Sequence, residues 1–283
     1  MCARTRLLSP DLHLKSGLDQ QPADATPQRV FITGASSGIG QALARYYSTQ
    51  GAALGLVARR GEELQKLAAT LGQPCAVYAL DVRDAKALQD AATDFMQRFG
   101  VPDIVIANAG VSRGTLTEFR EDIPAFKAIM EINVLGMVHT FQPFIAAMKE
   151  SSSKGRLVGI ASVAGIRGLP GAEAYSASKA AAIAYLESLR IEMAGFGIAV
   201  TTIAPGYIRT AMTDVNTYRM PFLMDVDVAV MKFAKAIAVR RRFVIIPWQM
   251  GVVARVMRLI PPKLWDWLMK KAPHKPRMDC DWL

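Results

Sequence analysis

Two side chains that could move a proton stand four residues apart in the stretch "AYSASKAAAIAYLESLR". They are the phenol of Tyr175 and the ammonium of Lys179. Four helical residues rise about 6 Å and complete slightly more than one turn, so both side chains lie on one face of the expected helix. A nearby ammonium favours the phenolate and lowers the phenol pKa from about 10. Tyr175 is therefore a candidate general acid and base, and an ordinary contact on a helix surface is the alternative.

A glycine-rich turn, "TGASSGIG", follows the apolar run "RVFIT" and opens the helical stretch "QALARYYSTQG". Gly34, Gly38 and Gly40 let the backbone turn tightly and approach a pyrophosphate, which the free amide groups at the helix start can hold. The strand before the turn and the helix after it are the context that this motif requires. A tight turn with a purely structural role is the alternative.

Two arginines end the second apolar run, in "GLVARR". A site for NAD places an acid there to accept a hydrogen bond from the 2′-hydroxyl of the adenosine ribose. Arg59 and Arg60 instead offer guanidinium forks, which suit a 2′-phosphate. The sequence therefore favours NADP over NAD, and a solvated basic turn before the helix "GEELQKL" is the alternative.

The elements that must position these residues follow an alternating pattern between Arg29 and Pro247. Short apolar runs, many of them β-branched, alternate with segments of helical periodicity. Strands that are apolar on both faces and alternate with helices predict a parallel, doubly wound sheet. The predicted strands lie in RVFIT, ALGLV, CAVYA, DIVIA, RLVGIA, IAVTTIA and FVIIP.

Several further motifs fall at the ends of these runs, and together they resemble the short-chain dehydrogenase/reductase family, in its single-domain branch. Open α/β sheets bind ligands at the carboxyl ends of their strands, where these motifs lie. The matching features are TGxxxGIG at Thr33 to Gly40, Asp81, the NAG of Asn108 to Gly110, Asn133, Ser162, YxxxK at Tyr175 to Lys179, and PGYIRT at Pro205 to Thr210.

The resemblance implies a Rossmann-like fold with a seven-stranded parallel sheet and helices on both faces. It also implies the catalytic roles. Tyr175 would exchange a proton with the carbonyl or alcohol oxygen, and Ser162 would hydrogen-bond the same oxygen. Lys179 would lower the pKa of Tyr175 and bind the nicotinamide ribose, while Asn133 would hold a water in the proton relay. Hydride transfer itself is the chemistry of the cofactor.

The resemblance also implies a cofactor site. Asp81 would contact the adenine, and Ile208 and Thr210 would meet the nicotinamide carboxamide. Ala107 stands where the family often has asparagine, which removes one supporting hydrogen bond. No second ligand lies at metal spacing from His139, so no metal is expected. The predicted cofactor-binding residues are Gly34, Ser36, Ser37, Gly38, Ile39, Gly40, Arg59, Arg60, Asp81, Val82, Asn108, Ala109, Gly110, Tyr175, Lys179, Pro205, Gly206, Ile208 and Thr210.

Beyond the motifs, the chain divides into an N-terminal arm (1–27), the NAD(P)-binding domain (28–247) and a basic amphipathic helical extension (248–283). The chain carries a net charge of +10, and Asp266 is the only acid between Lys232 and Arg277. A predicted stripe of Trp248, Val252, Val256, Leu259 and Ile260, followed by "KLWDWLMKK", is typical of interfacial helices. Residues 248–271 are thus expected either to contact anionic lipid or to pack over the substrate cleft or a partner subunit. No nucleic-acid module is present.

The function expected from these features is NADP(H)-dependent oxidoreduction of a hydrophobic ketone, aldehyde or secondary alcohol. An apolar flap between Tyr207 and Met224 favours a hydrophobic substrate. A non-catalytic dinucleotide-binding sensor or scaffold on the same fold is the alternative. The helices that carry Asn133 and Tyr175 form a dimer interface in this family, so a homodimer or homotetramer is expected. Three scattered cysteines favour a reducing compartment, hence a cytoplasmic protein or one attached to a membrane surface.

Overall fold

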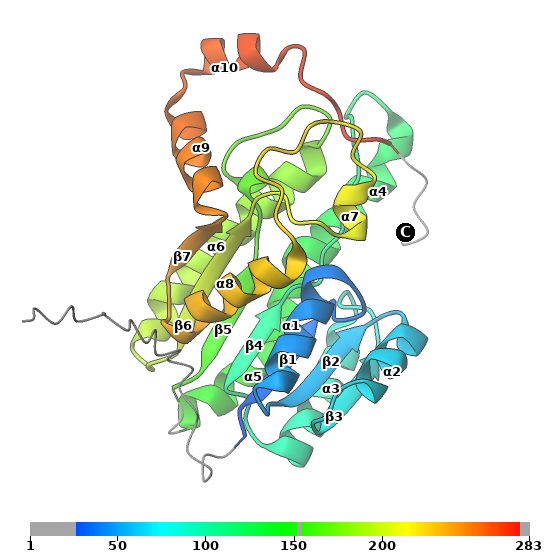
Figure 1. Ribbon diagram of the computed structural model, residues 1–283, viewed down its shortest axis with the longest axis vertical. Helices are drawn as coiled ribbons and strands as arrows, with labels where there is room; N and C mark the ends of the chain where they lie inside the picture. Colours follow the sequence, from blue (N-terminus) through cyan, green and yellow to red (C-terminus); the bar gives the residue numbers. More distant parts are fainter. Residues whose placement is uncertain (1–26, 152–153, 278–283) are drawn as a thin grey trace, which may run out of the picture.

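A parallel seven-stranded sheet forms the centre of the computed structural model, which describes residues 27–151 and 154–277 (Figure 1). The strand order is β3-β2-β1-β4-β5-β6-β7, and every pair is parallel. All seven predicted strands are confirmed, as is the doubly wound Rossmann-like class. The predicted arm, apart from its last residue, and the last six residues of the extension lie outside the described residues.

The bounds of the elements follow the alternation seen in the sequence. The strands are β1 (Arg29–Thr33), β2 (Ala53–Ala58), β3 (Cys75–Ala79), β4 (Ile104–Ala107), β5 (Arg156–Ile160), β6 (Ala199–Pro205) and β7 (Phe243–Ile246). The α-helices are α1 (Gly38–Thr49), α2 (Gly61–Ala69), α3 (Ala85–Phe99), α4 (Ile123–Met130), α5 (Gly136–Glu150), α6 (Glu173–Ala194), α7 (Ala211–Asp214), α8 (Val226–Ala238), α9 (Trp248–Leu259) and α10 (Pro262–Met269). One π-helical turn, η2 (Glu131–Leu135), joins α4 to α5, and a 3₁₀ turn, η3 (Val163–Gly165), follows β5.

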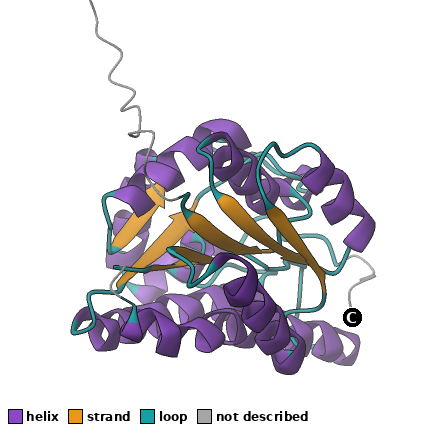
Figure 2. Ribbon diagram, turned by 90° about the horizontal axis from the view of Figure 1, so that it is seen from below, coloured by secondary structure: helices purple, strands orange, loops and turns teal. Residues whose placement is uncertain are grey.

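Helices cover both faces of the sheet because successive strand residues point to opposite sides (Figure 2). In β1, Val30 and Ile32 pack with residues of α1, α2 and α8, whereas Phe31 packs with residues of α3, α5 and α6. Phe31 also contacts the ring of Phe144, at 4.8 Å between ring centroids. Both faces of the strand are therefore buried, which explains why its sequence shows no polar alternation.

The sheet has a topological switch point between β1 and β4. The chain builds outward from β1 to β3 on one side and from β4 to β7 on the other. The turns after these two central strands separate there and leave a crevice at their carboxyl ends, the usual ligand position in open α/β sheets. The motifs noted in the sequence lie in the segments around this crevice.

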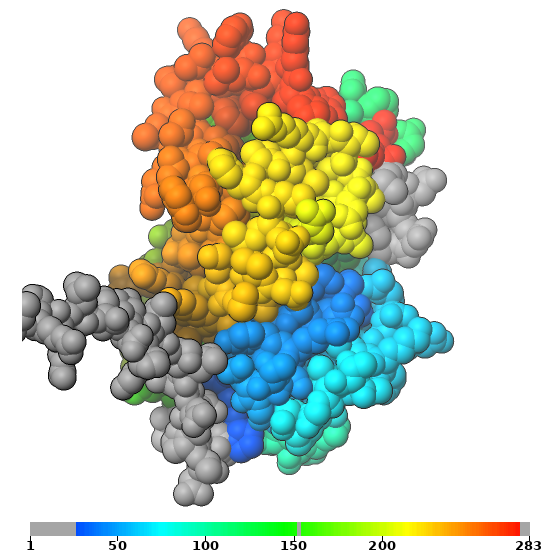
Figure 3. All heavy atoms as spheres, viewed as in Figure 1, coloured from blue at the N-terminus to red at the C-terminus, as the bar shows by residue number. Residues whose placement is uncertain are grey.

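The extension after β7 forms α9 and α10 at the end of the molecule that also holds the carboxyl ends of the strands (Figures 1 and 3). Met250 and Ala254 of α9 are buried. The predicted apolar stripe, in contrast, faces solvent, with Trp248 72% and Leu259 82% exposed. Across the described ranges, no helix is both long enough and apolar enough to cross a bilayer.

Candidate active site

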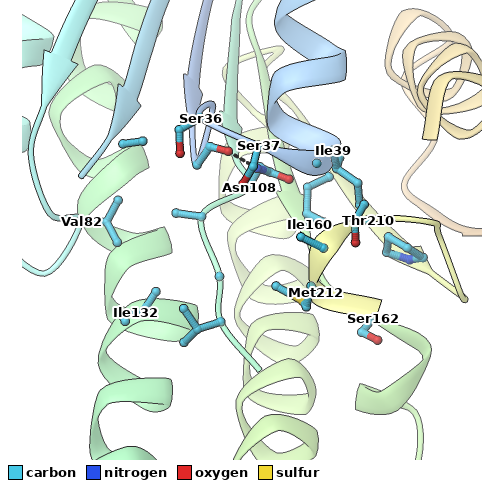
Figure 4. Close-up of a pocket in the computed structure, with 18 of the residues that line it drawn as sticks. Ser36, Ser37, Ile39, Val82, Asn108, Ile132, Ile160, Ser162, Thr210 and Met212 are labelled. Carbon is cyan, nitrogen blue, oxygen red and sulfur yellow. Dashed lines mark hydrogen bonds between the residues drawn. The ribbon is translucent and has the colours of Figure 1, made fainter. Parts of the chain in front are cut away.

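The crevice is a cavity of about 780 Å³ that runs from the glycine-rich turn to the start of α6. In Figure 4, Ser36, Ser37 and Asn108 lie at one end and Ser162 and Met212 at the other. The predicted site residues all line it, with two exceptions. Gly40 and Asn133 lie behind the cavity wall, where they support residues that do face the cavity.

Gly40 supports the glycine-rich turn by being small. A Cβ at this position would overlap the carbonyl oxygen of Gly34, whose own φ of +69° falls in the left-handed region that favours glycine. Asn108, after β4, ties the turn to the sheet, because its Nδ2 donates to the carbonyl oxygens of Thr33 (3.0 Å) and Gly34 (3.2 Å). The N-terminus of α1 thereby faces the cavity, where its free amide groups and helix dipole favour an anion.

Arg60 reaches back from the end of β2 to this turn. Its Nη2 donates to the hydroxyls of Ser36 (3.1 Å) and Ser37 (2.8 Å). Arg59 also lines the cavity, and its Nη1 lies 3.9 Å from the Asp81 carboxylate. Burial alone would raise the pKa of Asp81, but hydrogen bonds from Arg83 and the charge of Arg59 hold that pKa below its ordinary value. This end of the cavity therefore combines guanidinium and hydroxyl donors with one carboxylate.

The other end of the cavity brings Ser162, Tyr175 and Lys179 together. Ser162 follows β5 and caps η3 by accepting from the N–H of Ala164 (3.1 Å), and its hydroxyl lies close enough to the Tyr175 phenol to lower the pKa of that phenol. Lys179 is buried one turn along α6 from Tyr175 and donates to the carbonyl oxygen of Ile160 (2.9 Å). A phenol, a hydroxyl and an ammonium converge here, a combination suited to moving a proton onto or off a substrate oxygen.

The pKa of Tyr175 is shifted opposite to the expected direction. Burial raises the pKa of this phenol above 10, and the hydrogen bond with Ser162 only partly offsets the rise. The expected lowering by Lys179 is not found, because burial dominates and the Lys179 Nζ lies 5.8 Å from the centroid of the tyrosine ring. Burial likewise lowers the pKa of Lys179, to about 8. In this structure Tyr175 is a protonated donor at neutral pH.

Asn133 lies in the π-helical turn η2 and is completely buried. Its Oδ1 accepts from the N–H of Val111 (2.8 Å), and its Nδ2 donates to the carbonyl oxygen of Val111 (3.0 Å) and to the Ser178 hydroxyl (3.0 Å). Ser178 in turn donates to the carbonyl oxygen of Tyr175 (2.8 Å). Asn133 thus fixes the loop after β4 against α6. Ser178 links Asn133 to the backbone of α6.

The segment after β6 forms the wall opposite Tyr175. Pro205, Gly206, Ile208 and Thr210 line the cavity, followed by Met212 on the short helix α7. The expected flap runs from Tyr207 to Met224, and its apolar residues Ile208, Ala211 and Met212 line the cavity. The other apolar side chains, including the exposed Phe222, lie elsewhere. The apolar character of the flap therefore says less about the substrate than the sequence suggested.

The C-terminal segment contributes residues that sequence reasoning did not find. Lys275 lies with its Nζ 5.9 Å from the centroid of the Tyr175 ring and donates to the Ser112 hydroxyl (2.9 Å). Arg277 pairs with Asp122, whose Oδ2 is 2.8 Å from the arginine Nε. These partners are far apart in the chain and no motif joins them, so only the folded structure brings them together.

The described part of the chain holds no group of three His, Cys, Asp or Glu side chains that could bind a metal ion. The cavity instead fits a nicotinamide dinucleotide. Gly34 packs so closely against Ala109 and Asn108 that no side chain covers the backbone of the turn. The Arg60 guanidinium and the Ser36 hydroxyl lie at the same end of the cavity, where they can donate hydrogen bonds. These residues can therefore form a dinucleotide-binding site.

Comparison with known proteins agrees with this architecture. The family model for short chain dehydrogenases matches residues 28–219. An uncharacterized oxidoreductase of Myxococcus xanthus is 36% identical over 247 residues, which cover 86% of this chain and 97% of that protein. The dehydrogenase/reductase SDR family member 7B of Bos taurus is 32% identical and covers 88% of this chain, with 82% of its own length aligned.

Solved structures show the same fold. An alcohol dehydrogenase from the archaeon Thermococcus sibiricus, complexed with 5-hydroxy-NADP, is 26% identical with a TM-score of 0.69, covering 77% of this chain and 95% of that chain. A short chain dehydrogenase/reductase from Burkholderia phymatum in complex with NAD is 22% identical with a TM-score of 0.75, covering 88% and 97%. The motifs, the sheet and the matched family model lead to one conclusion. The chain belongs to the short-chain dehydrogenase/reductase family and is an oxidoreductase acting on CH–OH groups with NAD(P).

Proposed function

We propose that the protein is an NADP(H)-dependent oxidoreductase that transfers hydride between the nicotinamide and a hydrophobic ketone, aldehyde or secondary alcohol. The observation that carries the proposal is the convergence of Ser162, Tyr175 and Lys179 in the same cavity as the glycine-rich turn. A sensor or scaffold has no need of three such groups at one point. When bound, the cofactor supplies the hydride, and the protein supplies position and proton.

The catalytic residues have separate tasks in this proposal. Tyr175 donates its hydroxyl proton to the carbonyl oxygen in reduction and accepts it back in oxidation. Ser162 hydrogen-bonds the same oxygen and holds the phenol in place. Lys179, anchored on the carbonyl oxygen of Ile160, binds the nicotinamide ribose and offers positive charge beside the phenol as it loses its proton. Asn133 keeps the loop at Val111 in register with α6 and, as in the family, holds the relay water.

The preference for NADP rests on the arginines at the far end of the cavity. Arg60 already forks onto the Ser36 and Ser37 hydroxyls, and Arg59 lies beside it. Together they would hold a 2′-phosphate through charge-assisted hydrogen bonds. The Thermococcus sibiricus alcohol dehydrogenase, solved with 5-hydroxy-NADP, supports this choice by analogy. Asp81 is the one acid among the described residues that line this end, and it is already paired with Arg83.

Turnover is the direct test. Wild-type protein is assayed by NADPH oxidation over a panel of hydrophobic ketones and aldehydes, with Tyr175→Phe as the matched variant that keeps the ring but removes the hydroxyl. We expect the variant to bind NADPH as the wild type does and to lose at least about a hundredfold in rate. A Phe variant with full activity would remove Tyr175 from this role, and a wild type that binds NADPH but reduces nothing would favour the sensor.

We further propose that the exposed surface of the extension contacts anionic lipid. This interfacial surface comprises the exposed apolar residues Trp248, Val252, Val256, Leu259, Leu264, Trp267 and Leu268. Arginines and lysines flank it in the sequence, and the sole acid nearby is Asp266. Exposed tryptophans with basic neighbours suit the boundary between lipid headgroups and acyl chains. The protein would then be cytoplasmic and attached to the membrane surface.

We also propose that the protein is a homodimer or homotetramer. The outer face of α6 supports this, because it exposes a row of small and apolar residues rather than charges alone. The exposed members of that row are Ala177, Ala180, Ala184, Ser188 and Ile191. Small residues let the backbones of two helices approach closely, as an interface between copies of one chain requires.

A further inference from the structure

The residues after α10 form a strap, residues 271–277, that returns across the molecule from α10 toward α4 (Figure 1). The strap is packed against the loop that follows β4. A Cβ on Gly114 would overlap the carbonyl oxygen of Lys275, and the N–H of Gly114 donates to the carbonyl oxygen of Pro276 (3.1 Å). On the other side, a Cβ on Gly171 would lie 2.6 Å from the Cβ of His274. The strap therefore has a defined position between the loop after β4 and the segment that precedes α6.

Arg277 anchors the end of the strap. Its Nε and Nη2 donate to the Asp122 carboxylate at 2.8 and 3.2 Å, and its guanidinium stacks 3.7 Å from the centroid of the Phe119 ring. Asp122 is only 2% exposed and also accepts from the N–H of Leu116 (2.8 Å). The anchor is a charge-assisted pair on a buried carboxylate, and it holds Lys275 and Pro276 against the loop after β4.

Lys275 is the strap residue whose side chain approaches the reacting groups. Its Nζ donates to the Ser112 hydroxyl (2.9 Å), lies 3.5 Å from the carbonyl oxygen of Met212, and is 5.9 Å from the centroid of the Tyr175 ring. Met212 and Tyr175 both line the cavity. The ammonium thus stands between the loop after β4, the short helix α7 and the catalytic helix α6.

The charges around this ammonium are unbalanced. Three basic side chains, Arg113, Lys275 and Arg277, lie here, and Asp122 is the carboxylate that pairs with two of them. Lys275 has only neutral oxygen partners within the described ranges. The Nε of Arg113 is buried without a hydrogen-bond partner. Burial lowers the pKa of Lys275 to about 8, as expected for a desolvated cation without an acid beside it. A buried cation without an acidic partner lowers the stability of the fold unless an anion binds to it.

We propose that Lys275 is a specificity-determining residue that binds a carboxylate on the substrate, so that the compound reduced beside Tyr175 is an oxo acid with an otherwise apolar body. This inference rests on the proposed function and narrows its substrate class. The carboxylate takes the place of the missing acid partner, and the charge-assisted hydrogen bond to Lys275 orients the carbonyl toward Tyr175 and Ser162.

A simpler role for Lys275 would be to close the strap through its hydrogen bonds to Ser112 and Met212. The two roles differ in what a neutral donor can do. A glutamine at this position could still donate to the Ser112 hydroxyl, but it would carry no charge for a carboxylate. A methionine would remove both the hydrogen bond to Ser112 and the positive charge. An arginine would keep the charge.

The test uses matched carbonyl probes that differ only in charge, 4-acetylbenzoate with its methyl ester and 6-oxoheptanoate with its methyl ester. Each is titrated calorimetrically into full-length protein saturated with NADP⁺, where no reduction can occur. We expect the wild type to bind each carboxylate at least about tenfold more tightly than its ester, the effect of one charge-assisted contact. Lys275→Met and Lys275→Gln should lose the preference while binding the esters within about twofold of the wild type. Lys275→Arg and the exposed-site control Lys271→Gln should keep the preference.

Three results would overturn the proposal. The first is a wild type that binds the esters as well as the acids, or binds neither. The second is a Lys275→Met variant that keeps the preference. The third is a variant that weakens acids and esters equally, which would make Lys275 a strap contact only. Failure of the proposed function has a different signature, because the carboxylate preference would be present while NADPH oxidation is absent over the whole carbonyl panel.

Discussion

At the level of single residues, the raised pKa of Tyr175 determines how the two reaction directions depend on pH. Burial keeps this phenol protonated through the neutral range. Reduction needs the protonated phenol as donor, so its rate should stay level there. Oxidation needs the phenolate as base, so its rate should rise with pH, by up to about tenfold per pH unit while pH lies below the pKa. Initial rates in both directions across the neutral and alkaline range measure this.

The control for this pH dependence is Tyr175→Phe, which should abolish the rise in the oxidation rate without changing NADP⁺ binding. An oxidation rate that falls with increasing pH would contradict the assignment of Tyr175 as the base. The pKa of Lys179, lowered to about 8 by burial, adds a second effect of defined sign. As pH rises above this value the ammonium is lost, so the rates in both directions should decline at alkaline pH, and the rise in oxidation is expected only below a pH of about 8.

Arg60 allows a second prediction at this scale, on cofactor choice. Arg60→Ala removes the fork that contacts Ser36 and Ser37. We expect affinity for NADPH to fall about 10- to 100-fold, because a charge-assisted contact to the 2′-phosphate is lost, and affinity for NADH to change by less than about twofold. Quenching of protein fluorescence measures the dissociation constants of NADPH and NADH. Lys66→Ala, on the exposed side of α2, is the matched loss of charge and should leave both unchanged. If the affinities for NADPH and NADH fell equally, Arg60 would not be the residue that binds the 2′-phosphate.

At the level of elements, the strap is held by a carboxylate whose protonation has a predictable effect on stability. Burial would raise the pKa of Asp122, but the Leu116 N–H and the Arg277 guanidinium outweigh it and lower the pKa. A lowered folded-state pKa means that the stabilisation is present above the unfolded pKa and is lost as pH falls through the folded one. Asp122→Asn should therefore lower the free energy of unfolding by about 1–3 kcal/mol at neutral pH.

Urea unfolding of Asp122→Asn and wild type at neutral and acidic pH checks this prediction. The difference between the two proteins should shrink as pH is lowered, because the wild type then loses the same charge. Asp225→Asn is the control, since its ion pair with Arg209 has a similar separation (2.9 Å, against 2.8 Å for Asp122 and Arg277) but both of its side chains are exposed. That variant should change stability by less than about 1 kcal/mol. A difference for Asp122→Asn that grows in acid would contradict the argument.

The interfacial surface of α9 and α10 permits a test of the extension. Trp248 and Trp267 are each 72% exposed, so replacing both by serine should leave the fold intact. If they enter the lipid boundary, the double variant should bind anionic vesicles at least about tenfold more weakly, since each buried tryptophan contributes more than 1.4 kcal/mol. Co-sedimentation with vesicles of neutral and anionic lipid, at low and high salt, is the measurement.

The matched control for vesicle binding is a double variant at Met231 and Val239, which are exposed apolar residues on and just beyond α8, outside both the interfacial surface and the row on α6. Serine at those positions should not alter vesicle binding. The lipid proposal is wrong if the wild type stays in the supernatant with anionic vesicles, or if both double variants sediment equally well.

At the level of the whole molecule, sequence reasoning succeeded where the signal is local. The run RVFIT followed by TGASSGIG predicted both β1 and the turn, because strand, glycines and helix are contiguous. Lys275 could not be found in this way. Its partner Ser112 is 163 residues away and no spacing links them. The direction of the Tyr175 pKa shift was wrong because it depends on burial, which a helical-spacing argument does not measure.

The outer face of α6 carries the last prediction, the assembly of the whole molecule. If two copies pack along this helix, a charge placed among its exposed small residues should prevent close approach of the backbones. Ala184→Glu lies near the middle of that row. Light scattering after size exclusion should show a dimer or tetramer for the wild type and a monomer for the variant. The control Ala69→Glu, at an exposed position of α2, should leave assembly unchanged. A monomeric wild type would contradict the assembly, whereas a monomeric variant that keeps its catalytic activity would show that each chain holds a complete site.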